Sequence, residues 1–318
     1  MPRPLDRPRW KVVLAFAIIY LVWGSTFLAI RVGVREVPLF LLAGMRFLVA
    51  GIVLYLWMRL RGEPSPSRRH WISSFCLAVL IFVLDYGLLF WAEQRVPSGI
   101  AAVMMATIPV FITLFEVAFL RAQRLTLRLA FSLLIGIGGV GVLVSRSMGL
   151  GEVPLNRAGA IALLAAAVSW SLAAVLTREL PLPASRAMSS AAQMLVGGIL
   201  LTLVAGILGE FRDFHWQTVS RGAWLALLYL IVAGSLVAFT AYVWLIHHAS
   251  PTKVATYAYV NPVVAVVIGY FLGGEVIGVR TAVGTFLVLV SVMVISTAPA
   301  AKDESKPWTG PQPTLEAE

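Results

Sequence analysis

The chain has 318 residues, of which 59% are hydrophobic and 13% are charged, and its formal net charge is +10. Soluble domains carry about 25% charged and about 45–50% apolar residues, so this composition excludes a soluble enzyme and a disordered chain. A single cysteine, Cys76, also excludes a secreted scaffold held together by intrachain disulfides.

The apolar residues form long runs that are separated by charge clusters and by Gly and Pro. A run of about 20 apolar residues can cross a bilayer as a helix. The first run follows a basic segment that ends at Lys11, and it is too long for the apolar part of a signal peptide. We therefore predict an all-α polytopic membrane protein with ten transmembrane helices, at residues 12–32, 37–58, 71–91, 97–120, 126–145, 158–177, 187–208, 222–246, 252–272 and 279–297.

An even number of spans places both termini on one side of the membrane. Most Lys and Arg residues of the connections fall on that side, and cytoplasmic loops carry the Lys/Arg excess. We expect a bacterial-type inner (plasma) membrane protein with both termini in the cytoplasm: an N-terminal segment, 1–11, and a disordered tail, 298–318, that is rich in Pro, Lys and Glu. Because the basic residues flank apolar spans, we expect no contact with nucleic acid.

An internal repeat relates the two halves of the chain. Trp91 lies 18 residues before Pro109, and Trp244 lies 18 residues before Pro262. Each pair joins the end of one predicted span to the middle of the next. The repeat predicts two related units within one chain.

We place the first five-helix repeat at 12–148 and the second at 149–297. Because five is odd, the two repeats must have opposite orientations in the membrane. Inverted repeats around a central cavity are typical of secondary transporters, whose substrate site lies near the middle of the bilayer.

Three segments resemble motifs of one family: Trp23-Gly-Ser-Thr-Phe, Ala101…Pro109-Val-Phe, and Asn261-Pro262…Leu272-Gly-Gly-Glu275. They are similar to the EamA group of the drug/metabolite transporter superfamily, over residues 12–297. Within that group the chain most resembles the YddG type of amino-acid exporter. The resemblance implies export of small metabolites by alternating access, among them amino acids and related amphipathic or aromatic compounds, without catalysis, a metal or a cofactor. The first half departs from the pattern, because Gln123 stands where the second half has Glu275.

Three charged residues fall well inside the predicted spans: Arg46, Asp85 and Glu116. Such residues are costly in hydrocarbon and usually face the bundle interior or a water-filled cavity. Arg46 and Asp85 lie at similar depth, so we expect either an ion pair between two helices or a shared contact with a zwitterionic substrate. Asp85 and Glu116 are also the candidates for proton coupling. For Glu116, a simple contact with solvent or with Arg121 near the end of its span is the favoured interpretation.

Side chains of two repeat-related spans fall on matching helical faces around Pro109 and Pro262. Each proline removes an amide donor at midspan, so we predict a helix kink at both positions. Aromatic side chains in other spans could form an apolar cavity wall. Together with the charged residues, these faces give the predicted substrate-binding set: Trp23, Arg46, Asp85, Tyr86, Phe90, Met104, Ile108, Trp170, Tyr242, Tyr257 and Asn261.

Two alternatives remain at the level of the sequence. One is an importer or an exchanger of other metabolites, such as nucleotide sugars, although phosphorylated substrates would favour more buried cations than Arg46. The other is a membrane-embedded lipid-modifying enzyme. In each case the expected partners are a small-molecule substrate and the lipid bilayer, with the chain acting as a monomer or a homodimer.

Overall fold

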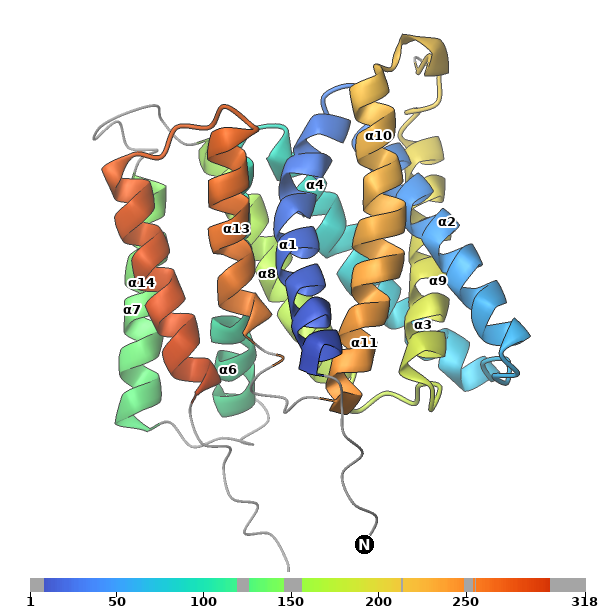
Figure 1. Cartoon of the computed structure of the whole chain (residues 1–318), viewed down its shortest axis with the longest axis horizontal. Coiled ribbons are helices and arrows are strands. Elements are labelled where there is room, and N and C mark those ends of the chain that lie inside the picture. Colours follow the sequence, from blue (N-terminus) through green and yellow to red (C-terminus); the bar gives the residue numbers. More distant parts are fainter. Residues whose placement is uncertain are drawn as a thin grey trace, which may run out of the picture.

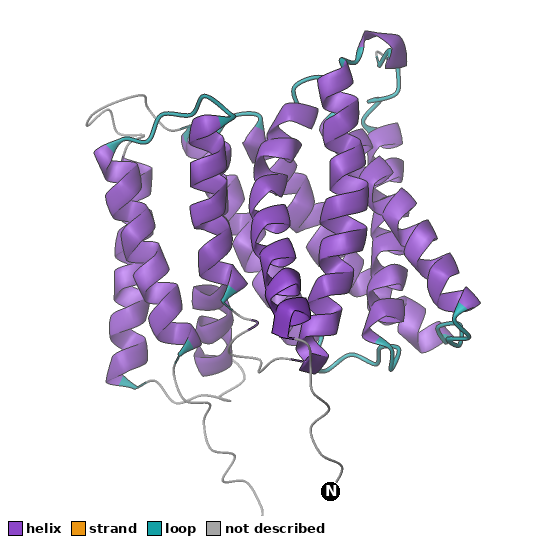
Figure 2. Ribbon diagram, in the orientation of Figure 1, coloured by secondary structure: helices purple, strands orange, loops and turns teal. Residues whose placement is uncertain are grey.

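The computed structural model describes residues 9–118, 126–145, 156–212, 214–248, 254 and 256–297. Regular structure in these ranges is entirely helical, and the helices lie side by side and run alternately up and down (Figures 1 and 2). Their bounds are α1 (Arg9–Gly33), α2 (Leu39–Leu60), α3 (Arg68–Ala78), η1 (Val79–Tyr86), α4 (Gly87–Glu93), α5 (Ser98–Met105), α6 (Ile108–Ala118), α7 (Leu127–Ser145), α8 (Arg157–Leu176), α9 (Arg186–Ile207), η3 (Trp216–Thr218), α10 (Arg221–Tyr229), η4 (Leu230–Val237), α11 (Ala238–His248), α13 (Tyr257–Phe271) and α14 (Val279–Ser296).

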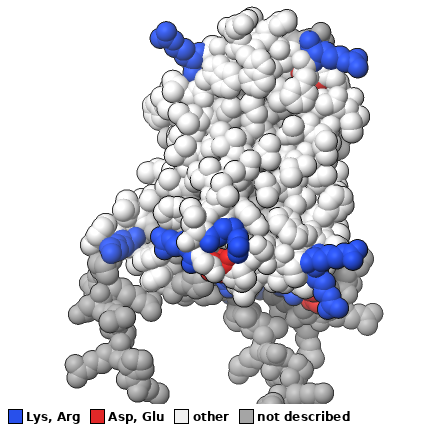
Figure 3. Space-filling view, turned by 90° about the vertical axis from the view of Figure 1, so that its right-hand side faces the viewer, with Lys and Arg blue, Asp and Glu red and all other residues white. Residues whose placement is uncertain are grey.

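The fold is that of a multi-pass helical membrane protein. Seven helices of the described residues are long and apolar enough to cross a bilayer. Three further apolar helices are shorter, at Leu127–Leu143, Tyr257–Phe271 and Thr281–Ile295. Each span expected from the sequence overlaps one of these helices. Lys and Arg side chains gather at the two ends of the bundle and leave an uncharged band between them (Figure 3).

Two of the long helices contain a stretch of π-helix. Segment η1 joins α3 to α4, segment η4 joins α10 to α11, and each is eight residues long. A π-helical turn holds more residues than an α-helical turn, so it changes the direction of the side chains, and such turns are frequent at functional sites. Segment η1 carries Asp85 and Tyr86, and η4 carries Gly234 and Ser235.

The two prolines that were expected to kink their helices lie in different local structures. Helix α5 ends at Met105 and α6 begins at Ile108, so the predicted span 97–120 is interrupted directly before Pro109. Helix α13 instead continues without interruption through Pro262. Pro262 has no amide hydrogen to donate to the carbonyl four residues earlier, so one hydrogen bond is missing within the continuous helix.

Helices α2 and α9 pack closely because glycines allow their backbones to meet. A Cβ atom on Gly198 would lie 2.3 Å from the backbone nitrogen of Leu48, and one on Gly51 would lie 2.5 Å from that of Leu195. Small residues allow this type of contact between membrane helices. The α2–α9 pair therefore holds the α2 side chains, including Arg46, in a fixed position beside the bundle centre.

Candidate functional site

A cavity of about 760 Å³ lies inside the bundle, within the size range of small-molecule sites. Its walls come from α1, α2, η1, α4, α5, α6, α8, α9, η4, α11 and α13. The cavity reaches the α8–α9 connection, where Leu182, Pro183 and Ala184 line it. That connection lies at the same end of the bundle as the start of α1 (Figure 1). We call this the near end and the other the far end.

Arg46 provides a buried positive charge in the cavity wall. Its side chain is 3% exposed, and its Nε donates to Ser235 Oγ at 3.1 Å. The guanidinium carbon lies 4.6 Å from the ring centre of Phe47 and 5.4 Å from that of Tyr86. A Cβ on Gly234 would lie 3.0 Å from Cγ2 of Thr26 and 3.5 Å from Nη2 of Arg46, so the tight contact of this glycine is with α1 and the guanidinium lies at ordinary contact distance. Nη1 has no hydrogen-bond partner in the described part of the chain and is free to bind an anionic group.

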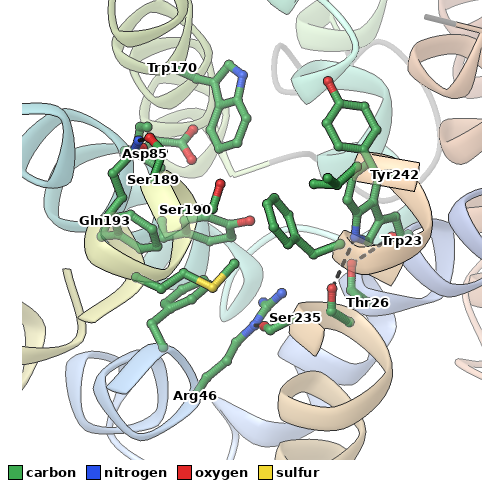
Figure 4. A pocket seen from close by; sticks show the side chains of 18 of the residues that line it. Trp23, Thr26, Arg46, Asp85, Trp170, Ser189, Ser190, Gln193, Ser235 and Tyr242 are labelled. Atoms are coloured by element: carbon green, nitrogen blue, oxygen red, sulfur yellow. Dashed lines mark hydrogen bonds between the residues drawn. The ribbon is translucent and has the colours of Figure 1, made fainter. Parts of the chain in front are cut away.

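Asp85 provides a buried acidic group in the same cavity. It is 1% exposed, and its Oδ1 has no hydrogen-bond partner among the described residues. The expected ion pair with Arg46 is absent, because the two side chains are not within salt-bridge distance of each other. Figure 4 shows Asp85 on the same side of the pocket as Ser189 and Trp170. The cavity wall therefore contains one buried acidic and one buried basic group that do not neutralise each other directly, besides the exposed Arg186.

Aromatic rings form two opposite walls (Figure 4). Trp23 and Tyr242 have ring centres 5.3 Å apart, and the Trp23 Nε1 donates to the Gly234 carbonyl oxygen at 3.1 Å. On the other side, Trp170 lies edge-on to Tyr86 with ring centres 6.2 Å apart. These walls suit an apolar or aromatic group between them.

The structure brings together every residue of the predicted substrate-binding set except Phe90 and Met104. These two side chains are fully buried in the hydrophobic core and do not line the cavity. Phe90 packs edge-on against Tyr86, with ring centres 6.2 Å apart, and is a buried member of the hydrophobic core. The adjacent Met105 lines the cavity in place of Met104. Glu116 is in α6, but its side chain lies outside the described residues, as does Gln123.

Several polar groups of the cavity were missed by sequence reasoning. They come from α1, the end of α8, α9 and η4 and comprise Thr26, Thr177, Arg186, Ser189, Ser190, Gln193 and Ser235. Gln193 donates through Nε2 to Ser189 Oγ at 3.0 Å. The internal repeat carried a signal for part of this set, because Gln193 follows Trp170 at the interval by which Arg46 follows Trp23.

The far end of the bundle is held by glutamates that accept hydrogen bonds from N-terminal groups of other helices. Glu275 accepts from Ser98 N and Oγ, both at 2.7 Å, and from Gly99 N at 3.0 Å, and it forms an ion pair with Arg31. Glu210 accepts from Leu41 N at 2.8 Å and from Phe40 N at 3.3 Å. The amides of a first helical turn have no acceptor within their own helix, and these carboxylates accept their hydrogen bonds instead.

Glu36 makes the same kind of contact, accepting from Ser220 N at 2.6 Å and from Ser220 Oγ at 2.7 Å. These bonds, the backbone one first, lower the pKa of Glu36 from its ordinary value. Burial raises the pKa of Glu210, although the bonds from Leu41 and Phe40 act in the opposite direction. The far end is therefore closed by hydrogen bonds and an ion pair that link neighbouring helices, whereas the cavity extends to the near end.

Comparison with known proteins gives a consistent result. The sequence model of the EamA-like transporter family matches residues 10–145 and 157–297. The uncharacterized inner membrane transporter YedA of Escherichia coli (strain K12) is 38% identical over 262 residues, which is 82% of each chain. The uncharacterized transporter YoaV of Bacillus subtilis is 22% identical and the match covers 89% of this chain and 96% of YoaV. One crystal structure has a similar fold, with a TM-score of 0.60 at 22% identity over 91% of this chain and 97% of that one.

Proposed function

This chain belongs to the EamA-like transporter family, and from that premise we propose that it is a secondary transporter that exports small amphipathic metabolites by alternating access. Amino acids and related aromatic compounds are the proposed substrates. One observation carries this proposal: a cavity between two aromatic walls contains a buried Arg46 and a buried Asp85, each with an atom that has no partner among the described residues.

A zwitterionic substrate carries one charged group that suits each of these side chains. Its carboxylate would accept from Nη1 of Arg46, and its ammonium group would donate to Oδ1 of Asp85. Its side chain would then lie against Trp170 or against Trp23 and Tyr242. Asn261, which is buried with a free Oδ1 in the described structure, supplies another acceptor.

We propose ten membrane crossings in two inverted repeats, with both termini in the cytoplasm. The paired family match and the π-helices in two long helices support the repeat. With this orientation the cavity faces the cytoplasm, and a substrate for export would enter there. The uncharged band between two charged ends supports the membrane position (Figure 3). Asp85 and Glu116 stay the proposed candidates for proton coupling.

Flux measurements in proteoliposomes that contain only this protein test the proposal. Labelled aromatic and aliphatic amino acids should move across the membrane, and Asp85→Asn should reduce their flux without preventing membrane insertion. A panel of nucleotide sugars provides the test of the exchanger alternative. Absence of flux for every substrate, together with turnover of lipid in detergent, would contradict the transporter and favour the lipid-modifying enzyme.

A further inference from the structure

A carboxylate at the far end of the bundle is not part of the cavity. Glu93 is the last residue of α4, is 1% exposed, and does not line the cavity. Neither of its carboxylate oxygens has a hydrogen-bond partner within the described ranges. A buried ionised carboxylate without a donor is strongly disfavoured and takes up a proton instead.

The surroundings of Glu93 do not compensate a negative charge. Helix α4 contacts α1, α2, α5, α8 and η1. The groups that act electrostatically on Glu93 are Arg31 of α1 and Glu275 of the α13–α14 connection. Arg31 is already paired with Glu275, and a second carboxylate nearby is repelled by the first.

Among the described residues, the other packed helices do not place a counterion against Glu93. Helix α5 contains no charged residue, and on α8 the charged residue is the exposed Arg157 at its start. Asp85 of η1 and Arg46 of α2 lie in the cavity wall. Burial, the absence of donors and the neighbouring Glu275 therefore all favour a neutral Glu93 in this closed arrangement.

We propose that Glu93 is a proton-binding site that couples closure of the far end to the pH on that side. Glu93 holds one proton while the Glu275 cross-link keeps the far end closed. When the far end opens, water reaches the carboxyl group, and the proton passes from its oxygen to that water. Closure therefore takes up one proton, and acid on the far side stabilises the closed state. This inference rests on the alternating access of the proposed function.

Ile30 is suited to report opening, because it lines the deep part of the cavity next to Arg31 in α1. The experiment uses the full chain in vesicles, with Cys76→Ser to remove the single native thiol and Ile30→Cys as the probe. A membrane-impermeant maleimide is added on the far side at several pH values. The labelling rate at Ile30→Cys is divided by the labelling rate at Val276→Cys. Val276 lies in a far-end connection and is 67% exposed, so this ratio corrects for ionisation of the thiol.

The corrected rate should rise with pH, by up to about tenfold per pH unit for one linked proton. Glu93→Gln mimics the protonated group, so its corrected rate should stay low and independent of pH. Glu93→Asp should keep the slope, and so should Glu179→Gln, which neutralises an exposed carboxylate that does not line the cavity. A pH-independent rate in the parent, an unchanged slope in Glu93→Gln, or loss of the slope in Glu93→Asp would overturn the proposal.

Two controls separate this test from folding and from the proposed function. Labelling of Thr177→Cys from the near side shows that the Glu93→Gln variant is folded around its cavity, which Thr177 lines. Failure of Ile30→Cys to react at any pH, in a parent protein that reacts at Thr177→Cys, would contradict alternating access itself. A pH-independent reaction at Ile30→Cys would contradict the role of Glu93 alone.

Discussion

Arg46 determines how an anionic group could be held in the cavity. Replacing it with alanine removes the free Nη1 donor, and a hydrogen bond to a charged group contributes about 1.5–3 kcal/mol. We expect the Kd for a zwitterionic substrate to rise about tenfold or more in Arg46→Ala. Arg46→Lys should restore part of the affinity, because lysine keeps the charge but not the planar donor geometry. Binding is measured by titration calorimetry in detergent.

The control for this prediction is Arg95→Ala. Arg95 is exposed, stacks on Trp91 at 3.8 Å and does not line the cavity. Its loss should leave the Kd unchanged. An equal rise in Kd for Arg95→Ala and Arg46→Ala would indicate a general effect of charge and would contradict the assignment of Arg46 to the site.

Trp170 is expected to set the preference for aromatic side chains. Aromatic pairs contribute about 0.5–1.5 kcal/mol beyond the burial of their area. Trp170→Ala should therefore raise the Kd of aromatic substrates several-fold more than the Kd of aliphatic ones. The ratio of the two Kd values measures this effect. Trp57→Ala, at an exposed position of α2, is the matched control, and a change of the same size there would count against the assignment.

At the scale of the helices, the caps of the far end should respond to pH. The folded-state pKa of Glu36 is lowered, so its bonds to Ser220 stabilise the fold fully above its ordinary value of 4.5. That contribution is lost as pH falls through the lowered value. The difference in Tm between the parent and Glu36→Gln should therefore be present at neutral pH and disappear in acid. A Tm difference that grows in acid would contradict this prediction, because Glu36 would then stabilise the fold more at low pH than at neutral pH.

The α2–α9 contact gives a second prediction at this scale. Gly198→Ala would force a Cβ to within 2.3 Å of the Leu48 nitrogen, and overpacking of this kind costs about 1–3 kcal/mol. Gly138→Ala on α7 meets nothing within 4 Å and should be neutral or slightly stabilising. Thermal unfolding of both variants in detergent measures the difference. Similar Tm values for the two would contradict the close approach of α2 and α9.

The sequence predicted helical segments well because apolar runs and charge clusters depend on the bilayer alone. It did not predict η1 and η4, because a π-helix has the same composition as an α-helix and its hydrogen bonds shift only under local packing. The predicted span 71–91 also ended before Glu93 and left that residue in a connection. In the structure the helix continues to Glu93 and buries it.

The cavity was predictable to the extent that the repeat reveals it. Trp23 and Trp170 begin the two halves, and both line the cavity. Met104 lies in the core and Met105 lines the cavity, because nearly every residue of α5 is apolar and the pattern does not show which face of the helix meets the cavity. The hydrogen bonds of Glu275 and Glu210 join residues that are far apart in the chain, so a local sequence pattern does not predict their partners.

At the scale of the whole molecule, a cavity that is open at one end and cross-linked at the other fits one state of an alternating-access transporter. Counterflow in proteoliposomes tests this claim most directly. Vesicles are loaded with an unlabelled aromatic amino acid, and a trace of the labelled compound is added outside. The labelled compound should accumulate transiently above its equilibrium level in the parent, and this overshoot should be absent in Arg46→Ala. Simple equilibration without an overshoot in the parent, for every amino acid tried, would contradict the proposed carrier.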